Sequence, residues 1–148
     1  MRHLEELSPR TVLFDVEPLI AYWDTDRGSL EKGVAAMLRA LSGFSGIGVV
    51  GFVTNSRRAS SVETPRGDLD VFYVASAGKP FRARSYRDLP RPGAVVGDQV
   101  ATDGVLAWRL GYSFLHYCPW FRIPLGPRLM RLAGLPLRPL LFRAGGSG

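Results

Sequence analysis

Two carboxylates in the second half of the chain, Asp98 and Asp103, lie five positions apart on either side of a predicted tight turn. The apolar residues 95–97 precede Asp98 and are typical of a short strand that ends at a glycine. Such a strand presents Asp98 at the carboxyl end of a sheet, where open α/β folds bind their ligands. Mg²⁺ prefers oxygen ligands and usually takes one or two carboxylates together with phosphate and water. The segment therefore predicts a site for a metal ion and a phosphate group.

Three further polar residues follow apolar stretches in a similar way. Asp15, Thr54 and Lys79 each come at or shortly after the end of a predicted buried strand. Because the carboxyl ends of parallel strands meet at one edge of a sheet, we expect these side chains to gather beside Asp98.

The elements that must position these residues alternate along the chain. Apolar runs predict the strands, and apolar residues at helical spacing predict the longest helix. The predicted strands cover residues 11–16, 47–53, 70–75, 94–96 and 112–117, and the predicted helices cover 28–41, 81–89 and 103–110. The polar residues 54–56 suit the cap of a further helix. Alternating strands and helices indicate parallel βαβ units, hence an α/β fold.

The chemistry also predicts a strand order. If one metal ion needs both Asp15 and Asp98, the first and fourth strands must be neighbours. The chain then winds outward through the second and third strands and returns to the other side of the first. The predicted order is 3-2-1-4-5, with the ligand site where the winding direction reverses.

In this arrangement the sequence resembles the haloacid dehalogenase-like (HAD) phosphohydrolase superfamily over residues 11–118. The resemblance rests on four residues that occur in the superfamily's order, namely Asp15, Thr54, Lys79 and Asp98. Phosphoaspartate receiver domains use similar residues, but their acidic pair precedes the phosphorylated aspartate and their lysine comes last. The stretches Ala-Gly-Lys-Pro at 77–80, Gly-Asp-Gln at 97–99 and Thr-Asp at 102–103 are most similar to the phosphatidylglycerophosphate phosphatase branch, HAD class IIIA.

The resemblance implies a role for each polar residue. Asp15 would be the nucleophile that forms an aspartyl-phosphate, because a covalent intermediate splits one difficult displacement into two easier steps. Thr54 and Asn55 would bind the phosphoryl group, helped by the N–H groups of the following helix. Lys79 would bind substrate and neutralise the nucleophile. Glu17 occupies the position of the general acid/base. A cap, turn or surface role is the structural alternative for each of these residues.

The same resemblance implies a Mg²⁺ cofactor. Its ligands would be Asp15, Asp98 and Asp103, the last directly or through water, and the residue at position 17 through its backbone carbonyl. Carboxylates brought together without a cation would repel one another, which is consistent with a metal ion among them.

Position 17 departs from the family pattern. The active phosphatases carry aspartate there, whereas this chain has Glu17, and Leu19 replaces the usual threonine. A reacting group misplaced by about 1 Å can lower a rate on the order of 10²-fold. The alternatives are therefore a phosphatase that acts on a phospholipid head group such as phosphatidylglycerophosphate, a phosphatase of a soluble phosphate ester, and a degenerate HAD-like module that binds without turnover.

The resemblance implies a three-layer, doubly wound Rossmann-like HAD fold, and we assign this domain to residues 1–118. Residues 17–46 offer one helix and a short loop, and residues 55–70 a short connection, so we expect no cap domain. Capless members of the superfamily tend to act on large or surface-presented substrates. Residues 119–144 form a basic, apolar tail, and residues 145–148 resemble a flexible linker. The last 45 residues hold six arginines and no acid, which accounts for the net charge of +6. Such a tail can bind an anionic membrane surface, pack on its own domain or dock on a partner protein.

The remaining features narrow the expected setting. The chain has a single cysteine, Cys118, which fits a reducing compartment. Residues 1–6 lack the apolar segment of a secretory signal, and no apolar run is long enough to span a bilayer. We therefore expect a cytoplasmic protein that can also lie at the inner face of the membrane. No nucleic-acid-binding module is recognised, so nucleic acid is not an expected partner.

Overall fold

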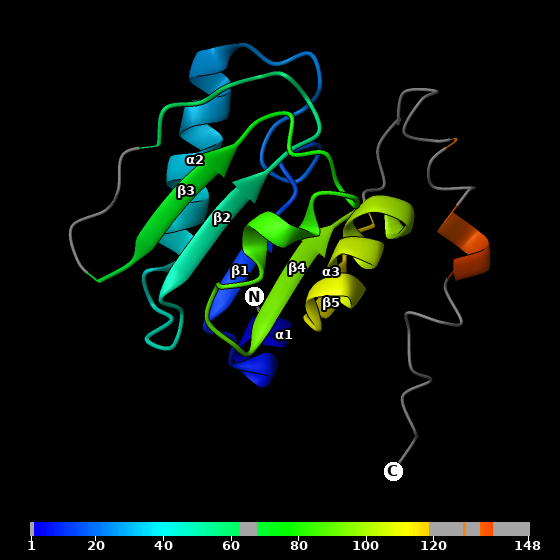
Figure 1. The fold of residues 1–148 in the computed structure, drawn as a ribbon. Helices are drawn as coiled ribbons and strands as arrows, with labels where there is room; N and C mark the ends of the chain where they lie inside the picture. Colours follow the sequence, from blue (N-terminus) through cyan, green and yellow to red (C-terminus); the bar gives the residue numbers. More distant parts are fainter. Residues whose placement is uncertain (1, 63–67, 119–128, 130–133, 138–148) are drawn as a thin grey trace.

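Five parallel strands form one sheet in the order β3-β2-β1-β4-β5 (Figure 1). The computed structural model describes residues 2–62, 68–118, 129 and 134–137. The strands are β1 (Thr11–Phe14), β2 (Val49–Val53), β3 (Asp70–Val74), β4 (Gly93–Gly97) and β5 (Ser113–His116). The predicted α/β class and strand order are therefore confirmed, and the sheet is consistent with a Rossmann-like fold.

Of the three predicted helices, two are present and differ from the prediction at their first residues. The helical elements are α1 (Arg2–Leu7), α2 (Arg27–Leu41), α3 (Val105–Leu110), the 3₁₀ turns η1 (Ala83–Tyr86) and η3 (Leu135–Leu137), and the π-helical turn η2 (Val100–Gly104). The short helix α1 was not anticipated; its Leu4 packs into the core. The helix α2 begins one residue earlier than predicted, because the Asp26 side chain accepts a hydrogen bond from the Ser29 N–H at 2.9 Å and caps it.

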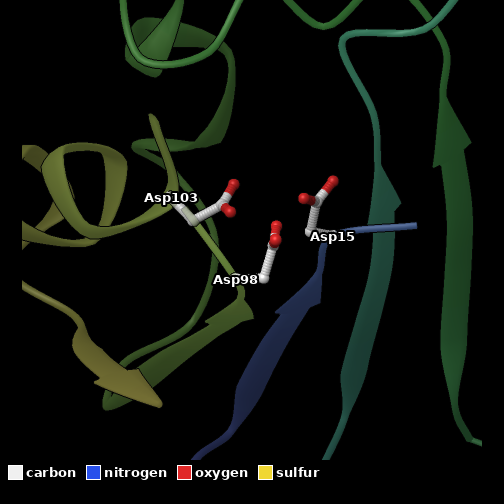
Figure 2. A group of neighbouring side chains, drawn as sticks. All are labelled: Asp15, Asp98 and Asp103. Atoms are coloured by element: carbon white, nitrogen blue, oxygen red, sulfur yellow. The ribbon is translucent and has the colours of Figure 1, made fainter. Parts of the chain in front are cut away.

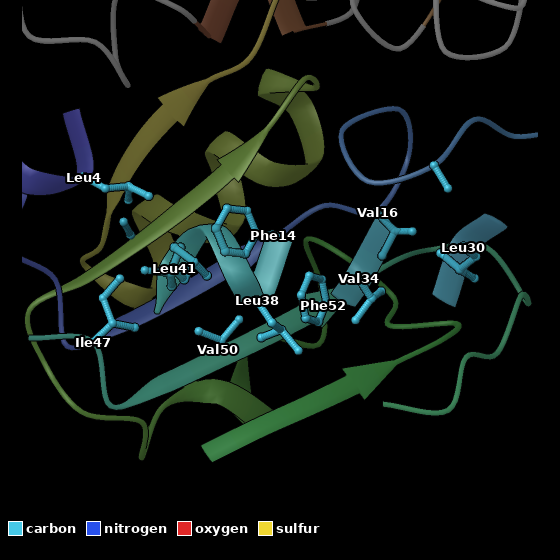
Figure 3. Packing of buried hydrophobic residues seen from close by; sticks show 13 residues of the cluster. Leu4, Phe14, Val16, Leu30, Val34, Leu38, Leu41, Ile47, Val50 and Phe52 are labelled. Atoms are coloured by element: carbon cyan, nitrogen blue, oxygen red, sulfur yellow. The ribbon is translucent and has the colours of Figure 1, made fainter. Parts of the chain in front are cut away.

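Helices pack against both faces of the sheet. Along β1, Val12 and Phe14 belong to the cluster covered by α2, whereas Leu13 belongs to the cluster covered by α3 and η1. Figure 3 shows the α2 side, where the rings of Phe14 and Phe52 stack with their centroids 5.9 Å apart. All four residues of β1 and all five of β2 are buried. These two strands are covered on both faces, as expected for a parallel sheet.

Two predicted helical features are corrected. The helix predicted over residues 81–89 is reduced to η1, whose buried residues Ala83 and Tyr86 lie three positions apart, the repeat of a 3₁₀ turn. Residues 54–56 cap no helix in the described stretch 54–62. There the Thr54 hydroxyl accepts the Ser56 N–H at 2.9 Å, and the Ser56 hydroxyl accepts the Arg58 N–H at 3.2 Å. Such local bonds compete with helix formation, so no helix N-terminus follows Thr54.

The register of the adjacent strands β1 and β4 brings Asp15 and Asp98 to the same edge of the sheet. Phe14 at the end of β1 pairs with Val96 of β4. The N–H of Asp15 continues the ladder by donating to the Val96 carbonyl at 2.8 Å. Asp15 and Asp98 therefore follow the carboxyl ends of adjacent strands, where the order of the sheet reverses.

The tail over 119–144 lies almost entirely outside the described residues, and residues 145–148 lie wholly outside them. Of its described part, Gly134 is buried against Val100 and Ala101 of η2. Between β1 and α2 the chain forms turns without another helix or strand. Among the described residues, no helix has both the length and the apolarity needed to cross a bilayer.

Candidate functional site

Three buried carboxylates converge at the carboxyl edge of the sheet (Figure 2). Asp15 follows β1, Asp98 follows β4, and Asp103 projects toward both from η2. Each offers one oxygen to a group in which all such atoms lie within 4.8 Å of one another. The exposed fractions of the three residues are 7%, 1% and 0%, respectively. The structure therefore brings together the three side chains that the sequence predicted as metal ligands.

The Lys79 ammonium group bridges two of these carboxylates. Its Nζ lies 2.7 Å from Oδ1 of Asp15 and 2.7 Å from Oδ1 of Asp103. Burial disfavours the charge on Lys79, but Asp103 and Asp15 outweigh that effect and raise its pKa. Lys79 is only 6% exposed, so it is a fixed cation inside the site and not a surface lysine.

The surroundings of Asp15 disfavour the charged form of its carboxyl group. Burial and the neighbouring Asp103 raise the pKa of the Asp15 carboxyl well above its usual range, while Lys79 acts in the opposite direction. Its Oδ1 also accepts the Val16 N–H at 2.9 Å, which fixes the orientation of the carboxyl group. A single lysine among three buried carboxylates leaves an excess of acidic groups, which a divalent cation would offset. The donor set thus fits Mg²⁺, which prefers carboxylate oxygens.

Asp103 owes its position to Gly97 and to the π-helical turn. A Cβ atom on Gly97 would collide with the Asp103 carboxylate, so the close approach requires glycine. The Gln99 carbonyl accepts the N–H groups of Asp103 at 2.8 Å and Gly104 at 3.3 Å, which widens the turn. Oδ2 of Asp103 accepts the Gln99 N–H at 3.2 Å. Asp103 therefore lies inside a helical turn and not at the start of the predicted helix; π turns are frequent at functional sites.

Asn55 holds the backbone of Lys79 on both sides. Its Oδ1 accepts the Lys79 N–H at 2.7 Å, and its Nδ2 donates to the Lys79 carbonyl at 3.0 Å. Both polar atoms of the Asn55 amide are therefore hydrogen-bonded to the loop after β3. The predicted substrate-binding role of Asn55 stays a prediction; in this structure the residue positions Lys79.

Glu17 and Thr54 form the second part of the site. The Thr54 hydroxyl donates to Oε2 of Glu17 at 2.5 Å, and both residues are buried. The carboxylate of Glu17 does not join the group formed by Asp15, Asp98 and Asp103. Its predicted role in metal binding concerned the backbone carbonyl and stays a prediction. Leu19 packs against the hydrophobic core, so its side chain serves packing.

Arg58 belongs to this part of the site and was missed in the sequence. Its Nη1 lies 3.6 Å from Oε1 of Glu17, and its side chain is 23% exposed. The Tyr73 hydroxyl donates to the Arg58 carbonyl at 2.9 Å. Burial, followed by the charge of Glu17, raises the pKa of Tyr73 to about 12. The consecutive arginines 57 and 58 were the available signal, but nothing in the sequence showed which of them faces inward.

No protein-family model, curated protein or solved structure matches the chain. The assignment of a function therefore depends on the site itself.

Proposed function

We propose that this protein is a Mg²⁺-dependent HAD-type phosphatase that hydrolyses a phosphate monoester through an aspartyl-phosphate. The observation that carries the proposal is the Lys79 ammonium group, which bridges Asp15 and Asp103 beside Asp98 at the carboxyl edge of adjacent parallel strands. The order of these residues along the chain, and the strand order 3-2-1-4-5, agree with a three-layer, capless HAD fold.

In the first step of the proposed reaction, Asp15 attacks the phosphorus atom. The attack comes from Oδ2, since Oδ1 is held by Lys79 and by the Val16 N–H. A P–O bond forms to Asp15 while the ester P–O bond breaks, and the leaving oxygen takes a proton from Glu17. Lys79 stabilises the negative charge on the phosphoryl oxygens in this step.

In the second step, water attacks the phosphorus atom of the aspartyl-phosphate. Glu17 accepts the water proton, the acyl-phosphate P–O bond breaks, and inorganic phosphate leaves with Asp15 restored. Thr54 lies beside Glu17 and donates a hydrogen bond to a phosphoryl oxygen once substrate replaces their mutual contact. General acid/base help of this kind contributes about 10²–10⁴-fold to a rate.

Mg²⁺ would be held by Asp15, Asp98 and Asp103. When bound, it supplies positive charge that orients the phosphoryl group and neutralises the charge developing on it.

A second candidate function is phosphate or partner binding without turnover. The contact between Thr54 and Glu17 favours it, because the hydroxyl that would bind phosphate is engaged by the longer acid. The substrate of an active enzyme would be either a phospholipid head group, such as phosphatidylglycerophosphate, or a soluble phosphate ester. The absence of a cap and the basic tail over 119–144 favour the phospholipid substrate. They also favour association of the protein with the anionic, cytoplasmic face of a membrane.

Magnesium-dependent release of phosphate tests the proposal. The wild type, Asp15→Asn, Glu17→Asp and the exposed control Asp88→Asn are assayed with a soluble monoester and with phosphatidylglycerophosphate in vesicles. The enzyme reading expects release by the wild type and by Asp88→Asn, and none by Asp15→Asn. An inactive wild type together with an active Glu17→Asp supports the binding module. Equal release by the wild type and Asp15→Asn removes Asp15 as the nucleophile.

A further inference from the structure

We propose that Arg58 is a positioning residue that holds Glu17 in place for proton transfer. This inference rests on the proposed phosphatase function and adds a residue outside the motifs of the resemblance. Two contacts hold the Glu17 carboxylate: Thr54 donates to Oε2 at 2.5 Å, and Arg58 Nη1 lies 3.6 Å from Oε1. Among the described residues, Oε1 has no hydrogen-bond partner, so the guanidinium is the charged group that faces it.

Arg58 is itself fixed by the loop that precedes α2. Its Nη1 donates to the Tyr22 carbonyl at 2.6 Å, and its Nη2 donates to the Thr25 carbonyl at 2.5 Å and to the Thr25 hydroxyl at 2.9 Å. The Tyr73 hydroxyl holds the backbone of Arg58 from β3 at 2.9 Å. A guanidinium group has five N–H donors in a rigid fork, and at least three are used here. These hydrogen bonds hold the Arg58 guanidinium in one position, which suits a residue that orients Glu17 rather than one that moves to bind substrate.

The contact with Arg58 compensates for the longer side chain at position 17, where the family pattern has aspartate. A glutamate is one methylene longer than the aspartate of the family pattern, so its carboxylate has more rotameric freedom to lose. A general acid must lie at hydrogen-bond distance from the leaving oxygen in a plausible substrate pose. Before substrate binds, Thr54 and Arg58 contact one oxygen each of the Glu17 carboxylate. Once the Thr54 hydroxyl donates to a phosphoryl oxygen, Arg58 is the contact that keeps the carboxylate in one region of the site.

The dependence of the rate on the leaving group tests this role. An alkyl phosphate needs a proton on its leaving oxygen, whereas p-nitrophenyl phosphate releases a stable phenolate. Arg58→Gln should lower kcat for an alkyl phosphate by about 10–100-fold, within the range of acid/base contributions. It should lower kcat for p-nitrophenyl phosphate much less. Arg58→Lys, which keeps the charge, should recover part of the loss, and the neighbouring exposed Arg57→Gln serves as the matched control.

A double-mutant cycle with Glu17→Gln completes the test. If Arg58 acts through Glu17, the double variant Glu17→Gln/Arg58→Gln should be no slower on the alkyl phosphate than Glu17→Gln alone. Equal losses on both substrates, or independent losses in the cycle, overturn the role of Arg58 and leave the phosphatase proposal intact. A wild type inactive on both substrates and on phosphatidylglycerophosphate in vesicles overturns both proposals. Circular dichroism verifies folding; if Arg58→Gln is unfolded, Arg58→Lys must by itself show the larger loss on the alkyl phosphate, and equal losses overturn the role.

Discussion

The side-chain amide of Asn55 is hydrogen-bonded to both backbone groups of Lys79, at 2.7 Å to the N–H and 3.0 Å to the carbonyl. The two residues belong to the loops that follow adjacent strands, β2 and β3. Their contact links the position of the buried ammonium group to the segment that carries Thr54. The Lys79 side chain therefore contacts Asp15 and Asp103 from a backbone position that Asn55 fixes.

Replacement of Asn55 should loosen Lys79 without removing any charge. Asn55→Ala deletes both hydrogen bonds and should cost roughly 1–2 kcal/mol of stability. Asn55→Asp keeps the acceptor for the Lys79 N–H but loses the donor, so its loss of activity should be intermediate. Urea unfolding and phosphate release measure the two effects. Equal activities of Asn55→Ala and the wild type would contradict a positioning role.

Removal of the ammonium group should destabilise the site strongly. Lys79→Met leaves Asp15 and Asp103 buried without their cation, and breaking a buried ion pair from one side typically costs about 3–5 kcal/mol. The exposed Lys32, the other lysine of the chain, supplies Lys32→Met as a matched control with a small effect. Urea unfolding of both variants without divalent cations gives the comparison. Similar losses in the two variants would argue against the bridge.

Mg²⁺ should stabilise the folded protein through Asp98. A ligand present at about 100 times its dissociation constant stabilises by about 2.7 kcal/mol. Asp98→Asn should lose most of this stabilisation, whereas the exposed Asp88→Asn should retain it. Thermal unfolding with and without Mg²⁺ measures the shift, and calorimetry measures the affinity. An unchanged shift in Asp98→Asn would exclude it as a ligand.

The stability of the metal-free protein should depend on pH through Asp15. Its carboxyl has an ordinary pKa of 3.8, which burial and then Asp103 raise in the folded state. Between the two pKa values the folded chain binds a proton that the unfolded chain has released, so stability falls as pH rises. In the presence of a chelator, Asp15→Asn should thus be more stable than the wild type at pH 7. The difference should shrink as the pH falls toward 4.

Urea unfolding across this pH range, with Asp88→Asn as the control, measures the difference. Asparagine keeps an oxygen that can accept from Lys79 and from Val16, so the substitution changes mainly the charge. A difference that is independent of pH would show that Asp15 is not the group responsible.

A methyl group at Gly97 should displace the Asp103 carboxylate. The added Cβ would occupy the space of the carboxyl group, and overpacking of this kind typically costs about 1–3 kcal/mol. Gly97→Ala should therefore lose Mg²⁺ affinity as well as stability. Gly46, which has open space around its Cα, provides Gly46→Ala as the control. Calorimetric titration with Mg²⁺ compares them, and equal affinities would contradict the steric argument.

The residues at the strand ends could be predicted because parallel strands all end at one edge of the sheet, so the residues that follow them lie close together. Once Asp15 and Asp98 were assumed to share an ion, the strand order 3-2-1-4-5 followed, and the structure has that order. Asp103 could also be predicted, since a turn after β4 returns it toward the sheet. Apolar periodicity located α2 to within one residue.

The contacts that side chains make across the site could not be predicted from the sequence. The two hydrogen bonds from Asn55 and the ion pair of Arg58 depend on rotamers and on loop paths that no periodicity encodes. The missing helix after Thr54 has a similar cause. Local bonds to Ser56 and Arg58 took the place of a helical turn, although the same polar residues would suit a cap.

The pairing of β1 with β4 also has a consequence for how the protein matures. Phe14 and Val96 are partners although most of the described chain separates them, and Asp103 comes later still. Contacts between such distant residues form slowly, because a long loop must close before they gain anything. During synthesis, the carboxylate group cannot assemble until Asp103 has left the ribosome. A metal-sensitive probe could therefore time the assembly of these three carboxylates in the nascent chain, a step that precedes the emergence of β5.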